Sequence, residues 1–222
     1  MRSTDRKHAR TAGISLILMA LIAGYAYGYV HSTLIVASHH NATFAHLKNA
    51  PSLYMSCVIG WIIILITDLL VAWSLYKFFA KVNARISLLS GLIRGIYSLI
   101  LAFAIFQLIA VGQLIHATEP DPAVIMHHLT LFEKYWSFGL ILFGGHLLAL
   151  GYLSVKSNDV PKWIGWLLCF AGFSYTFIHS AKAWTADTAE WISFVETILG
   201  LPMAFAEIGL AIWLLWKGGK QK

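Results

Sequence analysis

Six long apolar stretches constrain the fold of this chain more than any other feature. Residues 87–115, SLLSGLIRGIYSLILAFAIFQLIAVGQLI, contain a single charged residue. A bilayer core about 30 Å thick needs about 20 apolar residues in a helix, and all six stretches approach or exceed that length. We therefore predict six spans, at about residues 13–36, 53–79, 87–116, 132–155, 163–181 and 191–216.

The same stretches exclude a soluble domain and a membrane β-barrel. Hydrophobic residues make up 59% of the chain and charged residues 12%, which leaves too little polar sequence to cover a soluble domain. The strands of a barrel would alternate between apolar and polar residues, whereas these stretches are apolar on every face and must bond their own backbone as helices. We expect an all-α polytopic membrane protein, with residues 1–222 forming a single bundle of six transmembrane helices.

Lysine and arginine fall mainly on one side of this predicted topology. Twelve of them lie in the N-terminal segment, at the connections after the second and fourth spans, and at the C-terminus. The opposite side carries only Lys48, Lys134 and Lys182. Cytoplasmic loops are enriched in these residues, so we expect both termini on the cytoplasmic side of the cytoplasmic (inner) membrane. The net charge of +6 then reflects topology and attraction to anionic membrane lipids, and it does not indicate a nucleic-acid partner.

Four ionisable residues lie deep inside the predicted spans: Asp68, Arg94, His146 and Glu207. A charged side chain at the centre of a membrane helix costs about 3 kcal/mol on insertion scales, so it is normally kept with a partner, water or a role. Counted from the cytoplasmic end of its own span, each lies about 7 to 11 residues inside, which is roughly 10 to 17 Å at the helical rise. We expect the four side chains to share one polar layer in the inner half of the bilayer.

Two interpretations of this layer remain open from the sequence. In the structural one, Arg94 neutralises Asp68 or Glu207, His146 supplies a hydrogen bond, and the cluster fixes which helices pack together. In the functional one, a carboxylate and His146 exchange protons and Arg94 holds an anion, so that the layer binds or passes a small ligand, an ion or a proton. The spans contain no HExxH motif, which makes an enzyme the less favoured class.

A second set of candidates lies on the outer side, where eight of the ten histidines gather. His31, His116 and His179 come near the outer ends of three spans, and Glu196 lies near the outer start of the sixth. Imidazoles on facing helices are ligands for haem iron, zinc or copper, which would suit a membrane oxidoreductase or another metal-dependent enzyme. The alternative is that a histidine at a helix C-terminus is stabilised by the helix dipole and binds nothing.

Two pairs of glycines have the spacing that allows helices to approach closely. Gly24 and Gly28 lie in the first span, and Gly91 and Gly95 lie in the third. Small residues four positions apart are enriched at contacts between membrane helices. We expect both pairs to serve contacts within the bundle rather than dimerisation.

Several segments of the chain together resemble a known family. These are ARTAGISLIL, TDLLVAWSLYKFFAKVN, LIRGIY, GHLLALGYLSVKSNDVPKWIGWLLCFAGFSYTF and AEIGLAIWLLWKG. They are similar to the successive signatures of a prokaryotic family of six-span membrane proteins whose function is unknown, DUF4386. The resemblance singles out the same four residues as the predicted layer, and it implies no substrate or cofactor. The loop histidines lie outside the family pattern: His39, His40, His127 and His128.

Overall fold

The computed structural model describes residues 2–36, 39–184 and 190–220, and this part of the chain is helical without a strand. Six of its helices are long and apolar enough to cross a membrane, which confirms the prediction of an all-α chain with six helices of membrane-spanning length. The first rod joins α1, the π-helix η1 and α2 without a break. The element bounds are α1 Arg2–Ala23, η1 Gly24–His31, α2 Ser32–Leu34, α3 His40–Asn49, α4 Pro51–Phe79, α5 Ala84–Leu114, α6 Pro122–Lys156, α7 Lys162–Trp184 and α8 Glu190–Trp216.

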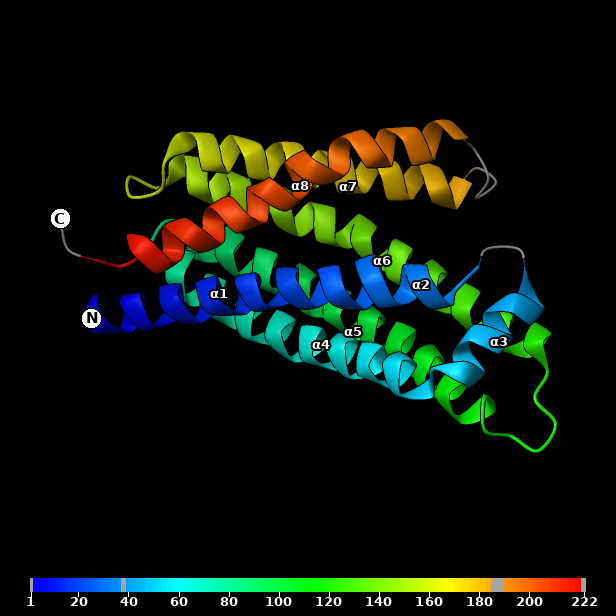
Figure 1. The fold of residues 1–222 in the computed structure, drawn as a ribbon. Helices are drawn as coiled ribbons and strands as arrows, with labels where there is room; N and C mark the ends of the chain where they lie inside the picture. The colour runs from blue at the N-terminus through cyan, green and yellow to red at the C-terminus, as the bar shows by residue number, and fades with distance from the viewer. Residues whose placement is uncertain (1, 37–38, 185–189, 221–222) are drawn as a thin grey trace.

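The six long helices form a closed ring in chain order. Each packs against the next, in the order α1, α4, α5, α6, α7 and α8, and α8 returns to pack against α1 (Figure 1). Both chain ends lie at the same end of the bundle, which we call the terminal face, and α3 lies at the other end, which we call the distal face. Side chains that point into the ring are therefore enclosed by helices on every side.

The terminal face is closed by a contact between the first and last helices. Arg6 on α1 donates hydrogen bonds to the carbonyl oxygens of Leu214, at 2.9 Å, and Gly218, at 2.8 Å, at the C-terminal end of α8. The last carbonyl groups of a helix have no partner inside the helix, so a cation there satisfies them and also complements the negative end of the helix dipole. This contact holds α1 and α8 together at the terminal face.

Two predicted loops on the distal side are helical instead. Residues His40–Asn49 form the short helix α3, which packs against α6 and α4. α6 begins at Pro122, about ten residues before the predicted start, so His127 and His128 lie in a helix and not in a loop. Asp121 caps this helix by accepting a hydrogen bond from the Ala123 amide at 2.8 Å, and proline is favoured in the first turn. The Asp121-Pro122 pair marks the start of helix α6, which hydropathy alone did not reveal.

The expectation for the glycine pairs was mostly wrong. A Cβ atom added to Gly24, Gly28 or Gly95 would meet no atom within 4 Å, and only Gly91 faces a neighbouring helix. The close approach occurs between α6 and α7, through two pairs that face each other: Gly144 with Gly172, and Gly151 with Gly165. A Cβ added at Gly172 would lie 2.7 Å from the Gly144 carbonyl oxygen, so side chains there would force the two backbones apart.

Candidate functional site

The four residues of the predicted layer lie on four different helices at one depth. Asp68, Arg94, His146 and Glu207 are each 9 to 11 residues from the terminal-face end of their own helix, which corresponds to about 15 Å. The side chains of the first three are fully buried, whereas Glu207 is half-buried. The structure thus brings three of the candidates into direct contact and sets the fourth beside them.

Asp68 and Arg94 form a buried ion pair between α4 and α5. Arg94 Nη2 lies 2.5 Å from Asp68 Oδ1, and both side chains are 0% exposed. By geometric criteria both carboxylate oxygens and Arg94 Nε have no hydrogen-bond partner among the described residues, so the contact is best described as an ion pair. Coulomb attraction, which is strong in a medium of low dielectric constant, therefore holds the two side chains together. Asp68 Oδ2 keeps the capacity to accept a hydrogen bond.

His146 on α6 orients the guanidinium group of Arg94. Its Nε2 lies 3.1 Å from Arg94 Nη1, and its Nδ1 lies 2.9 Å from the carbonyl oxygen of Ser90. A guanidinium group only donates, so Nε2 must accept, and the proton is assigned to Nδ1, which donates to the Ser90 carbonyl. His146 is thereby neutral. Its ring serves as a fixed acceptor for Arg94 rather than as a second positive charge.

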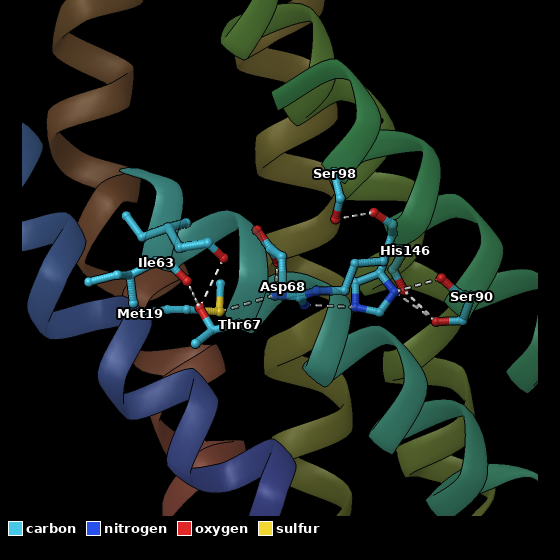
Figure 2. A network of polar contacts seen from close by, with 9 residues as sticks. Met19, Ile63, Thr67, Asp68, Ser90, Ser98 and His146 are labelled. Carbon is cyan, nitrogen blue, oxygen red and sulfur yellow. Dashed lines mark hydrogen bonds and ion pairs between the residues drawn. The ribbon is translucent and has the colours of Figure 1, made fainter. Parts of the chain in front are cut away.

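Arg94 joins the interior sides of several helices. Besides Asp68 and His146, its guanidinium carbon lies 5.0 Å from the centre of the Phe143 ring, and Nη2 lies 3.8 Å from Met19 Sδ on α1. Figure 2 shows Met19, Asp68 and His146 converging on this centre from three helices. An aromatic face and a polarizable sulfur are both favourable neighbours for a cation. A single charged side chain of α5 therefore contacts α1, α4 and α6.

Glu207 on α8 is the member of the layer that lacks a partner. Among the described residues it has neither a hydrogen bond nor an ion pair. Arg94 and Asp68 lie within electrostatic range of its carboxylate, and so does Tyr175 on α7. The layer therefore contains two carboxylates and one guanidinium, and the guanidinium is already in contact with Asp68.

Several residues of the layer were not predicted from the sequence. Ser90 and Ser98 lie one helical turn before and after Arg94, and the Ser98 hydroxyl donates to the Arg94 carbonyl oxygen at 2.9 Å. Tyr97 is buried within electrostatic range of Asp68 and Arg94, and Tyr175 lies near Glu207. The signals were present: serines at positions i−4 and i+4 share the arginine's face, and tyrosine usually lies at the membrane interface rather than at the centre of a span.

The outer candidates for metal or haem ligation are not brought together. His31 Nε2 lies 3.0 Å from Glu133, and His179 Nδ1 lies 2.8 Å from the Ser137 hydroxyl oxygen. Lys182 holds both oxygens of Glu196 at 2.8 Å, and His116 is exposed. Across the described residues, no three His, Cys, Asp or Glu side chains lie close enough to hold a metal ion. A shared position near helix ends placed these residues at one depth, but each is engaged or exposed separately rather than gathered into one site.

The comparisons with known proteins place this architecture in a family. The model of the family described as "Domain of unknown function (DUF4386)" matches residues 11–218, which include the whole polar layer. The chain belongs to the DUF4386 family. An archaeal relative from Archaeoglobus fulgidus, named only as an uncharacterized protein, is 31% identical over 174 residues, which cover 78% of this chain and 90% of the relative. No solved structure matches this DUF4386 protein.

Proposed function

We propose that this DUF4386 protein binds an exchangeable proton or monovalent cation at Glu207, inside the membrane, and that Asp68, Arg94 and His146 hold the surrounding bundle in place. The observation that carries the proposal is the mismatch of charge in the layer. Among the described residues Glu207 has no hydrogen bond or ion pair, while the guanidinium group of Arg94 is engaged by Asp68 at 2.5 Å.

The physical reason is the cost of an isolated charge in a membrane interior. An unpaired carboxylate in a medium of low dielectric constant is unfavourable by several kcal/mol, so it takes up a proton or a counter-ion. Arg94 lies within electrostatic range of Glu207 without contacting it, and this limits how tightly a cation is retained. A site that binds a cation weakly can release it again, as exchange of a proton or cation with the surroundings requires.

The orientation of the protein belongs to the same proposal. We place the terminal face in the cytoplasm and the protein in the cytoplasmic membrane. Twelve of the sixteen lysine and arginine residues support this orientation, since they lie near the chain ends and the two connections on that face. Membrane lipids are then the surrounding partners, and basic side chains such as Lys156 meet the anionic leaflet.

Carbodiimide labelling tests the proposal directly. Dicyclohexylcarbodiimide enters bilayers and modifies protonated carboxyl groups, so we expect one modification at Glu207, located by peptide mass spectrometry of the protein in lipid nanodiscs. Glu207→Gln should abolish it. Glu196→Gln is the matched control on the same helix, because Glu196 already has a lysine partner, and it should leave labelling unchanged. Protection by sodium, lithium or potassium would identify a cation, and no protection by any of them would identify a proton. Absence of labelling at Glu207 in the folded wild-type protein would refute the proposal.

A purely structural role is the second candidate, and one observation favours it. Arg94 contacts residues from α1, α4 and α6, as expected for a side chain that fixes helix packing. This role requires nothing of Glu207. The structural candidate therefore predicts that the free energy of unfolding depends on Arg94 and not on Glu207.

A further inference from the structure

We infer that Glu207 communicates with the distal face and is sealed from the terminal face, along a route lined by Tyr175 and Glu196. This inference rests on the proposed function, since it concerns how the same carboxylate is reached. It assigns a role to Tyr175 and Glu196, which the proposed function does not use.

The face of α8 that carries Glu207 is more buried on its terminal side than on its distal side. Residues 196, 200, 203, 207, 210 and 214 alternate by four and three positions, so they share the face that points into the ring. On the terminal side of Glu207, Leu210 and Leu214 are buried at 1% and 0% exposure. On the distal side, a Cβ added at Gly200 would meet no atom within 4 Å, and Glu196 is part-exposed. Met203 is the one buried side chain of this face on the distal side of Glu207.

The rest of α8 shows the same division. Between residues 191 and 202, Ile192 is the single buried residue, whereas six residues are buried between 203 and 214. Figure 1 agrees: the terminal half of α8 runs beside α1, and its distal half runs beside α7. The distal half of this helix is therefore less enclosed than the terminal half.

The terminal side of the layer is filled by large apolar side chains. Phe78 and Phe79 of α4 are buried, and the ring centre of Phe78 lies 6.2 Å from that of Trp213. A Cβ added at Gly13 would meet the Leu215 side chain at 2.7 Å, so α1 and α8 have no space between them there. Packing of this density excludes water from the contact of α8 with α1 and α4. The polar side chains buried on this side of the layer are serines, such as Ser15, Ser74 and Ser154, which carry no titratable group.

Titratable side chains continue from Glu207 in the distal direction. Tyr175 is half-buried and lies within electrostatic range of both Glu207 and Glu196, although the two carboxylates are 11 residues apart, about 17 Å along α8. Its ring stacks on that of His179, with 6.1 Å between the centres. Tyr27 of η1 also lies within electrostatic range of Glu196, and of Glu133, and its side chain is part-exposed. Groups that can exchange protons thus extend from Glu207 towards the distal face.

Cysteine accessibility in lipid nanodiscs tests this inference. Both membrane faces are open to solution in a nanodisc, so reaction with a charged, membrane-impermeant thiol reagent reports water that reaches the residue through the protein. Gly200→Cys and Leu214→Cys form a matched pair, each seven residues from Glu207 on one face of α8. The native Cys57 and Cys169 are first replaced by alanine. Only the thiolate reacts, so we expect labelling of Gly200→Cys to be at least about tenfold faster than labelling of Leu214→Cys.

Two further variants make each outcome decisive. Ile198→Cys places a thiol on the lipid-exposed side of the same part of α8, and it should react as slowly as Leu214→Cys. If Leu214→Cys does not fold, Ala211→Cys replaces it, since Ala211 is fully buried and the change is small. Equal rates at positions 200 and 198, or fast reaction at position 214 or 211, would overturn the inference. The cysteine rates are measured without reference to Glu207 chemistry, so this failure is distinguishable from an absence of carbodiimide labelling at Glu207.

Discussion

The two sides of the polar layer differ in how their charges are satisfied. On the α5 side, Arg94 contacts Asp68 at 2.5 Å and His146 at 3.1 Å, and all three side chains are buried. On the α8 side, Glu207 lies at the same depth without a hydrogen bond or ion pair among the described residues. Equal depth in a membrane therefore does not imply an equal role. A charge that is held by fixed partners contributes to packing, and one that is left without them is available for exchange.

The largest effect should come from removing the charge of Arg94. Arg94→Gln leaves the Asp68 carboxylate buried without its cation, and breaking such a pair typically costs about 3 to 5 kcal/mol. We expect the free energy of unfolding in mixed micelles to fall by an amount of this order. A loss of less than about 1 kcal/mol, the value typical of an exposed pair, would contradict the account of the α5 side.

The double variant Asp68→Asn with Arg94→Gln sharpens the same comparison. It removes both charges together, so no uncompensated charge remains in the bundle. We expect the double variant to be more stable than Arg94→Gln alone, with a coupling energy of about 1 to 3 kcal/mol in a double-mutant cycle. Simple additivity of the two single changes would mean that the ion pair contributes little.

A smaller effect is expected at His146. His146→Ala removes the acceptor at Arg94 Nη1 and the donor to the Ser90 carbonyl, both of which are buried. Loss of a partner from a buried polar group costs about 1 to 3 kcal/mol. The unfolding measurement should therefore place His146→Ala between Arg94→Gln and wild type. Ser154→Ala is a suitable control, because the buried Ser154 hydroxyl has no hydrogen-bond partner among the described residues, and its loss should change stability little.

Much of the fold followed from hydropathy, and so did the depth of the layer. A span of about 20 apolar residues admits only one kind of backbone pairing, so the six helices and the common depth of Asp68, Arg94, His146 and Glu207 were predictable. Rotation about each helix axis was not. It depends on side-chain packing between helices, which is why the outer histidines at one depth form no metal site among the described residues and why Gly24 and Gly28 face no neighbour.

The partners within the layer also depended on geometry. The sequence left open whether Arg94 neutralises Asp68 or Glu207, because either carboxylate lies at a suitable depth. Helix order around the ring decides it: α5 packs against α4, whereas α8 packs mainly against α7 and α1. The π-helix η1 was also not predicted, since its eight residues differ little in composition from an ordinary membrane helix.

One comparison tests the division of the layer most directly: the free energies of unfolding of Asp68→Asn and Glu207→Gln. Each change replaces a carboxylate by an amide of the same shape, at the same depth. We predict that Asp68→Asn destabilises the protein, because Arg94 loses its counter-charge. Glu207→Gln should leave stability unchanged or raise it, because no partner is lost. Equal destabilisation by the two changes would contradict the division of the layer into a structural ion pair and a free carboxylate.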